Sequence, residues 1–153
     1  MIDRLRVTPV SYVILRRGES VLLQLRCDTG YMDGYWATAA AGHVEANESA
    51  AQAAIREAHE ELGVSVGREQ LVPLTAMHRA QGTGGSADGR VDFFFECTAW
   101  QGGPQLMEPE RASELGWFHL DDLPRAVVPH ERYVFERLRT GMAPIITFGF
   151  APG

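Results

Sequence analysis

The stretch "GHVEANESAAQAAIREAHEELGV", residues 42–64, decides the fold expected for this chain. It predicts a helix that begins at Asn47 or Glu48 and ends at Leu62. Asn47 is a suitable N-cap, because its side chain can accept a hydrogen bond from the first turn of a helix. Gly63 stands where a glycine commonly ends a helix.

One face of this helix is a narrow apolar stripe of mostly small residues. It consists of Ala51, Ile55, Ala58 and Leu62. Small side chains let a helix lie close to its neighbours, so we expect this face to pack against a β-sheet.

A second face of the helix carries three carboxylates. Glu57, Glu60 and Glu61 are spaced i, i+3 and i+4, so they are neighbours that repel one another. They also stand at the C-terminal end, where the helix dipole disfavours anions. A hard divalent cation such as Mg²⁺ or Mn²⁺ would resolve this conflict, since such ions prefer carboxylate oxygens. Spacing alone leaves two interpretations open, a solvated acidic face and a metal site.

Strand-like runs flank the helix on both sides. Before it, two β-rich runs within residues 8–26 surround a turn at residues 17–19. After it, the aromatic run of residues 91–100 indicates a strand that is buried on both faces. We also expect strands over residues 71–80, 115–120 and 143–153, loops over 27–42, 81–90 and 102–114, and a second helix from His130 or Glu131 to Gly141. This order suits a mixed sheet with helices packed on it.

Length, composition and charge narrow the class of protein. With 153 residues, 45% of them hydrophobic, the chain is expected to form a single domain over residues 1–153. The net charge of -6 argues against a nucleic acid polymer as a partner. Cys27 and Cys97 form no paired motif, so a reducing, cytoplasmic setting is expected. We expect neither a signal peptide nor a membrane span, since no apolar run of about 18 residues exists.

The glycine and charged residues of the opening stretch follow a recognisable order. They are Gly42, Glu48, Arg56, Glu57, Glu60, Glu61 and Gly63. This order resembles the Nudix box, G-x5-E-x7-R-E-U-x-E-E-x-G-U, in which U is an aliphatic residue. The resemblance implies the Nudix fold, an α/β/α sandwich with a mixed β-sheet. It also implies hydrolysis of a nucleoside diphosphate linked to another moiety, with Mg²⁺ or Mn²⁺ as cofactor.

The resemblance also assigns roles within the box. Glu57, Glu60 and Glu61 would be metal ligands, and one of them, or a water that they orient, would be the general base. Glu48 and Arg56 would form a salt bridge that positions these carboxylates.

Two further oxygen ligands are expected outside the box. The main-chain carbonyl of Ala41 would supply one, and Gly42 would permit the tight loop there. A distal acid would supply the other. Among Glu108, Glu110 and Glu114 we choose Glu108, with an exposed loop acid as the alternative.

The segment before the box departs from the family pattern. Many members carry Trp-x-Leu-Pro followed by Gly or Ala and then Gly, whereas this chain reads "WATAAAG" over residues 36–42. The proline is missing, and Trp36 is one residue farther from Gly42 than the pattern has it. We therefore expect the loop to bulge.

Five residues are candidates for binding the substrate. Arg26 and Arg90 lie at the ends of expected strands, and each would either bind phosphate or be solvated. His43 would either contact phosphate or have no role. Trp36 would stack on a base or pack in the core. His130 lies in "VPHE", residues 128–131, which aligns with the Trp-Pro-Asp-Asp that contacts the base in oxidised-purine triphosphatases. Because the tryptophan and the first aspartate are lost, a strong preference for an oxidised purine is not expected.

The substrate is narrowed by the residues downstream of the box. The signatures of ADP-ribose, dinucleoside polyphosphate, NADH and coenzyme A hydrolases are not found there. The leading prediction is a MutT-type hydrolase that converts a nucleoside triphosphate to a monophosphate and pyrophosphate. The alternatives are a nucleotide-sugar or dinucleoside polyphosphate hydrolase and a non-catalytic nucleotide-binding regulator. The expected partner is a small nucleotide, and a homodimer is left open.

Overall fold

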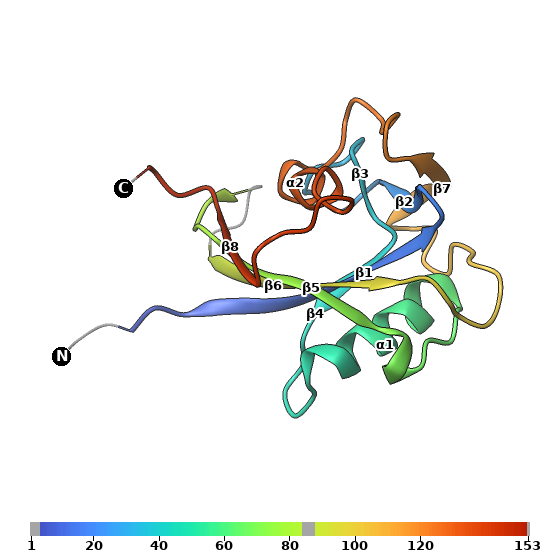
Figure 1. The fold of residues 1–153 in the computed structure, drawn as a ribbon, viewed down its shortest axis with the longest axis horizontal. Coiled ribbons are helices and arrows are strands. Elements are labelled where there is room, and N and C mark those ends of the chain that lie inside the picture. The colour runs from blue at the N-terminus through green and yellow to red at the C-terminus, as the bar shows by residue number, and fades with distance from the viewer. Residues whose placement is uncertain (1–3, 84–87, 153) are drawn as a thin grey trace.

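A mixed β-sheet lies between two helical layers in the computed structural model, which describes residues 4–83 and 88–152 (Figure 1). Residues 84–87 of the expected loop lie outside the described residues. The elements are β1 Val7–Arg17, β2 Ser20–Arg26, β3 Trp36–Thr38, β4 Ala40–His43, α1 Ala50–Leu62, the 3₁₀ turn η1 Arg68–Gln70, β5 Val72–Arg79, β6 Gly89–Cys97, β7 Ala112–His119, α2 Pro129–Phe135 and β8 Ile145–Phe148. This arrangement confirms the expected α/β/α sandwich with a mixed sheet.

Strand β1 is the centre of the sheet and the point where it divides. Along one edge, β1 runs parallel to β6 from Val7 to Leu15. Along the other edge, it pairs first with β4 and then, at Arg16 and Arg17, with β2. Strand β3 pairs with β2 although β4, which follows it in the chain, pairs with β1. The chain therefore crosses between two parts of the sheet at Ala39, and the sheet splits there.

Each face of the sheet buries its own hydrophobic core. Val13 and Leu15 of β1 belong to the core beneath α1, whereas Tyr12 and Ile14 belong to the core beneath α2. This alternation follows from the two-residue period of a strand. In β6, Phe95 joins the first core and Phe94 the second, which confirms that this strand is buried on both faces.

Helix α1 begins later than the sequence predicted. Its N-cap is Ser49, whose hydroxyl accepts a hydrogen bond from the Gln52 amide while the Gln52 side chain accepts one from the Ser49 amide. Asn47 lies outside the helix in a left-handed conformation with φ 68°. The reciprocal capping box satisfies two backbone donors, which explains why the helix starts here. The predicted end at Leu62 and Gly63 is confirmed.

Three other predicted boundaries were wrong. The expected bulged loop before the box is two short strands, β3 and β4, because long-range pairing outweighs the weak strand propensity of alanine. Strand β7 starts at Ala112, inside the predicted loop, since it pairs with β2 along its whole length. Helix α2 ends at Phe135, and turns with i+3 and i+4 hydrogen bonds continue the chain toward Gly141.

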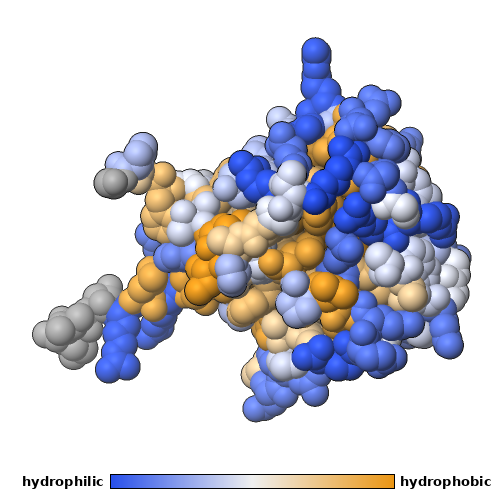
Figure 2. Space-filling model, viewed as in Figure 1, coloured by the Kyte–Doolittle hydropathy of each residue, from blue (hydrophilic) through white to orange (hydrophobic). Residues whose placement is uncertain are grey.

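The surface drawn in Figure 2 combines a hydrophobic area in its middle with hydrophilic residues around it. A shallow apolar groove of about 370 Å³ is lined by residues that include Pro73, Leu74, Met142 and Pro144. Among the helices of the described residues, none is long and apolar enough to cross a membrane.

Candidate functional site

A cleft of about 760 Å³ opens beside the C-terminal half of α1. Its walls come from the ends of β2 and β5, the start of β6, strand β4, the loop around Thr29 and the start of α2. This volume falls in the range of small-molecule sites, which is roughly 300–1,000 Å³.

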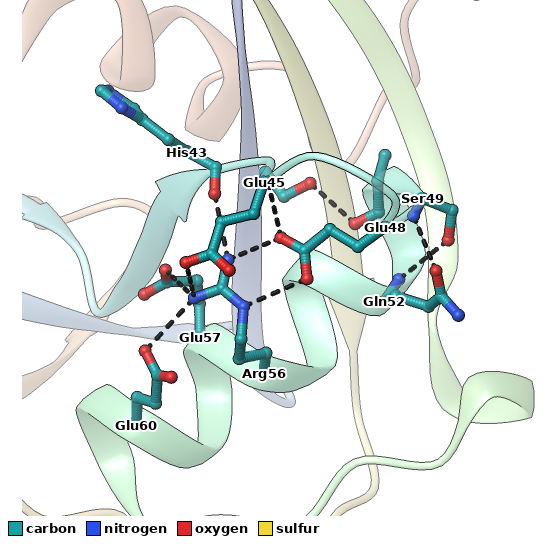
Figure 3. A network of polar contacts seen from close by, with 10 residues as sticks. His43, Glu45, Glu48, Ser49, Gln52, Arg56, Glu57 and Glu60 are labelled. Atoms are coloured by element: carbon teal, nitrogen blue, oxygen red, sulfur yellow. Dashed lines mark hydrogen bonds and ion pairs between the residues drawn. The ribbon is translucent and has the colours of Figure 1, made fainter.

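Arg56 is the centre of the polar network at one end of the cleft (Figure 3). Its Nε and Nη2 donate to the two carboxylate oxygens of Glu48, at 3.1 and 2.7 Å. Its Nη1 donates to Glu57 at 2.7 Å and to Glu60 at 3.2 Å, and Nη2 also donates to the His43 carbonyl at 3.0 Å. The hydrogen bonds to Glu48 raise the pKa of Arg56 and lower that of Glu48. The ion pair expected between Glu48 and Arg56 is therefore present and bidentate.

Glu57 and Glu61 are the carboxylates that point into the protein. Glu57 is 9% exposed, and the Glu61 carboxylate accepts a hydrogen bond from the Ala41 amide at 3.2 Å. Burial raises the pKa of Glu61 well above its ordinary value, and the charges of Glu57 and Glu108 raise it further. Burial also raises the pKa of Glu57, although Arg56 opposes the effect. A cation or a proton shared between these two carboxylates would relieve their mutual repulsion.

Gly42 makes room for Glu57. A Cβ atom at this position would lie 2.2 Å from the Glu57 carboxyl carbon, a distance far inside van der Waals contact. A side chain at position 42 would therefore have to displace the Glu57 carboxylate.

The donor set of this end of the cleft suits a hard divalent cation. Glu57, Glu60, Glu61 and Glu108 line the cleft and offer only oxygen ligands, which Mg²⁺ and Mn²⁺ prefer. No three acidic, histidine or cysteine side chains of residues 4–83 and 88–152 are already gathered as a metal site. Arg56 holds Glu57 and Glu60 instead, so a cation here would draw these carboxylates away from the guanidinium.

A second polar cluster lies at the α2 side of the cleft. The Tyr12 hydroxyl and His130 Nε2 share a hydrogen bond of 2.9 Å, and burial lowers the pKa of His130 well below its ordinary value. The Glu131 carboxylate accepts a hydrogen bond from the Thr38 amide at 2.7 Å. Burial raises the pKa of Glu131 to about 7. The Thr38 hydroxyl is buried beside the Glu131 carboxylate.

A buried ion pair adjoins this second cluster. Arg79 of β5 donates from Nε and Nη2 to the two carboxylate oxygens of Asp92 on β6, at 2.8 and 3.1 Å. The Arg79 side chain is 4% exposed and that of Asp92 is 0% exposed. Tyr31 approaches from the loop between β2 and β3, with the Arg26 guanidinium over its ring at 5.0 Å. The Tyr31 hydroxyl is buried beside the Arg79 side chain.

The structure brings most of the predicted site residues together. Those that line the cleft are Arg26, Ala41, His43, Arg56, Glu57, Glu60, Glu61, Arg90, Glu108 and His130. Trp36 does not line it, because its ring packs edge-on against Phe118 in the core beneath α2. Glu48 also lies outside the lining and contacts the cleft through Arg56 and the Glu45 amide.

Sequence reasoning missed several polar residues of the cleft. They are Tyr12, Thr38, Arg79 and Glu131, together with Asp92, which lies outside the lining and pairs with Arg79. Asp92 and Arg79 carried a signal, because each is a charged residue in a strand-like run that is mostly apolar. Tyr12 and Thr38 carried none that spacing reveals, since they come from distant elements. Glu131 carried one, because it follows His130 in the segment "VPHE" that is a candidate for base contact.

Comparisons with known proteins agree with this architecture. The family model of the NUDIX domain matches residues 5–138. An isopentenyl-diphosphate Delta-isomerase from Cereibacter sphaeroides is 35% identical over 123 residues, covering 79% of this chain and 69% of the relative. The NAD-capped RNA hydrolase NudC from Stutzerimonas stutzeri is 31% identical over 119 residues, covering 78% of this chain and 39% of the relative.

Solved structures show the same fold. A MutT NUDIX hydrolase from Burkholderia pseudomallei superposes with a TM-score of 0.77 at 27% identity, covering 87% of this chain and 98% of that one. A MutT protein from Bacillus halodurans superposes with a TM-score of 0.71 at 22% identity, covering 95% of this chain and 92% of that one.

Proposed function

We propose that this chain, which belongs to the Nudix family and is a pyrophosphohydrolase of that family, converts a nucleoside triphosphate to a monophosphate and pyrophosphate. The observation that carries the proposal is the pair of inward-facing carboxylates, Glu57 and Glu61, at one end of a cleft of nucleotide size. Two neighbouring acids whose pKa values are raised by burial are typical of a functional site.

Each part of this end of the cleft has a role in the proposed reaction. Glu57, Glu60 and Glu61, with the Ala41 carbonyl and Glu108, would hold Mg²⁺ or Mn²⁺. The bound ion would neutralise phosphate charge and lower the pKa of an attacking water. One of the glutamates would accept the proton of that water. Arg56, fixed by Glu48, would hold the carboxylates in place and offset part of their charge.

The remaining cleft residues would bind the substrate. Arg26 and Arg90 place guanidinium groups on the cleft wall, where they would contact phosphate oxygens. His43 lies on the same wall and would do likewise. His130 and Glu131 at the α2 side would face the nucleoside.

A second candidate function comes from the isomerase relatives. Isomerisation of an isoprenoid diphosphate is favoured by the 35% identity to an isopentenyl-diphosphate Delta-isomerase. An isoprenoid chain is apolar, however, and the α2 side of the cleft holds Tyr12, Arg79, His130 and Glu131. Burying hydrocarbon against such groups without satisfying them is unfavourable. We therefore rank this function below nucleotide hydrolysis.

A substrate panel tests the proposal. The protein is incubated with Mg²⁺ and nucleoside triphosphates, ADP-ribose, a nucleotide sugar, a diadenosine polyphosphate or isopentenyl diphosphate, and the products are resolved by chromatography. We expect pyrophosphate and monophosphate from triphosphates, and no turnover after chelation with EDTA. Cleavage of ADP-ribose alone, or isomerisation of isopentenyl diphosphate, would refute the proposal. Metal-dependent nucleotide binding without any turnover would identify the chain as a regulator.

Replacing Glu61 tests the assignment of the carboxylates. Glu61→Gln removes the buried charge but keeps the size, so we expect kcat to fall by roughly 10²–10⁴-fold, the range typical of a lost proton-transfer or metal-binding group. The matched control is Glu69→Gln, which alters an exposed acid of η1 outside the cleft. A Glu61→Gln protein as active as the control would show that Glu61 is not part of the machinery.

A further inference from the structure

One edge of the β-sheet is open in the part of the chain that the structure describes. Strand β8 is the last strand in the sheet order and pairs with β5 alone. It covers only the second half of β5, from Ala76 to Arg79. The outer side of β8 therefore has no paired strand among the described residues, and such an edge is a template for pairing with another chain.

The backbone of β8 directs alternate hydrogen-bonding groups toward this open side. The carbonyls of Pro144 and Phe148 accept hydrogen bonds from amides on the β5 side. Hydrogen-bonding groups alternate in direction along a strand, so those of Ile145 and Thr147 point away from β5. The amides and carbonyls of these two residues are thus directed toward a further strand.

The same edge is apolar and exposed. Ile145 is 73% exposed, Val72 at the start of β5 is 54% exposed, and Phe150 just after β8 is 49% exposed. The shallow groove of about 370 Å³ lies beside them, and among the described residues that line it only Thr75 is polar. Figure 2 shows a hydrophobic area in the middle of the face on which Figure 1 places β5 and β8. Contiguous apolar surface of this kind is typical of an interaction site.

This edge is also uncharged, although the chain is acidic. Residues 142–152 contain no charged side chain, and neither does the described lining of the groove. The whole chain carries a net charge of -6, so two copies repel each other least where their neutral edges meet. An acidic or basic peptide would find no charge to pair with here. The charge distribution therefore favours a second copy of the chain as the partner.

We propose that two copies of this chain associate through this edge, with β8 of one copy antiparallel to β8 of the other. A register centred on Ile146 places Ile145 of each copy opposite Thr147 of the other. Every outward amide and carbonyl of these residues then has a partner. Pairing a strand with itself in this way creates a two-fold axis, which is the commonest symmetry of protein dimers. The dimer goes beyond the proposed function and does not depend on it.

The same register brings apolar side chains together. It places the end of β8 of the second copy beside Met142 and Pro144, which line the groove. Phe150 follows that end by two residues, and its ring lies 4.8 Å from that of His78 on the same edge. Because β8 has only four residues, strand pairing alone is weak and apolar contact must supply the rest. We therefore expect a dissociation constant in the micromolar range.

Sedimentation velocity of the unmodified chain tests the dimer. Between about 1 and about 200 µM, the mass is expected to rise from 16.9 kDa toward twice that value. Added salt should strengthen the association, because it screens the repulsion between acidic copies. A chain that stays monomeric over this range, whether or not it binds phosphatidylcholine vesicles, would overturn the proposal. Association that weakens with salt would point to ion pairs and overturn it as well.

Two variants locate the contact. Ile145→Lys places a charge in the apolar contact, and Thr147→Pro removes an outward amide without removing a hydrogen bond to β5. We expect each to raise the dissociation constant about tenfold or more. The controls are Thr147→Ala, which keeps the amide, and Tyr35→Lys, which charges an exposed aromatic next to β3 at the other end of the sheet. Association that survives Ile145→Lys and Thr147→Pro unchanged would overturn the proposed edge.

Hydrogen exchange decides the question if a variant does not fold. In the unmodified chain, the amides of Ile145 and Thr147 should exchange rapidly at about 1 µM and become protected at about 200 µM. The Ala76 amide is the internal reference, because it already donates to the Pro144 carbonyl within one copy. Exchange of Ile145 and Thr147 that does not change with concentration would overturn the proposal. Loss of nucleotide hydrolysis in the panel described above would leave the dimer untouched.

Discussion

Gly42 has a hydrogen in place of a side chain, and this affects the position of the Glu57 carboxylate at the acidic end of the cleft. Any Cβ here would collide with the Glu57 carboxyl group, whose oxygens in turn receive the Arg56 guanidinium. Glu57 cannot move freely, because Arg56 is itself held by Glu48. The absence of a side chain at Gly42 therefore leaves the space that the Glu57 carboxylate occupies.

Gly42→Ala is expected to lower activity more than stability. The new methyl group would push Glu57 aside, and displacements of about 1 Å in a catalytic group cost on the order of 10²-fold in rate. Steady-state kinetics with Mg²⁺ and a triphosphate measures the loss. Gly103→Ala is the control, because a Cβ there would meet no atom within 4 Å. Equal activity of the two variants would mean that Glu57 can shift at no catalytic cost.

At the scale of elements, the two ends of helix α1 matter more than its length for where its carboxylates lie. The start at Ser49 sets which turn faces Gly42 and therefore where Glu57 and Glu61 point. Gly63 ends the helix in a left-handed conformation, with φ 70° and its amide bonded to the His59 carbonyl. Local hydrogen bonds fix both ends.

Ser49→Ala removes the capping hydroxyl and should destabilise the protein by about 1 kcal/mol. The free energy of unfolding from urea denaturation, with EDTA present, measures the effect. Asn47→Gly is the informative comparison, because glycine accepts the left-handed conformation of that position at no steric cost. We expect it to be neutral or slightly stabilising. A larger loss from Asn47→Gly than from Ser49→Ala would restore Asn47 as the cap.

The elements that the sequence predicted well are those whose signals are local. The helix end at Gly63, the turn around Gly18 and the doubly buried strand β6 each depend on neighbouring residues. The short strands β3 and β4 do not, because their alanines pair with β2 and β1 only once the sheet has formed. The same holds for the site. The acidic residues of the box lie within a few turns of one helix, whereas Tyr12, Thr38, Arg79 and Glu131 meet from separate elements.

At the scale of the whole molecule, buried ionisable groups make stability depend on pH in opposite directions. The pKa of Glu131 is raised to about 7 by burial, and those of Glu57 and Glu61 are also raised. Such acids contribute stability that is full below the ordinary pKa of 4.5 and is lost as pH rises through the folded value. His130, with its lowered pKa, destabilises the fold as pH falls below its ordinary value of 6.5.

Glu131→Gln isolates one of these contributions. A difference of pKa from 4.5 to about 7 corresponds to stability on the order of 3 kcal/mol, which the unmodified protein would lose between about pH 4.5 and pH 8. The variant lacks this decline, so its free energy of unfolding should rise relative to the unmodified protein across that window. Urea denaturation at several pH values, in EDTA, measures the difference. Parallel curves would show that Glu131 titrates near its ordinary pKa.

The parallel pairing of β1 with β6 also determines when the centre of the sheet can form during synthesis of the chain. Residues 7–15 of β1 cannot form their parallel pairing until residues 89–97 of β6 have been synthesised. Helix α1 is synthesised well before then. A nascent chain or fragment that stops short of Gly89 would carry the complete acidic box and still leave one edge of β1 without its partner. Unpaired strand edges recruit other chains. The acidic box is thus synthesised before the strand that pairs with the edge of β1. Premature termination between the two would yield a fragment that aggregates rather than a smaller enzyme.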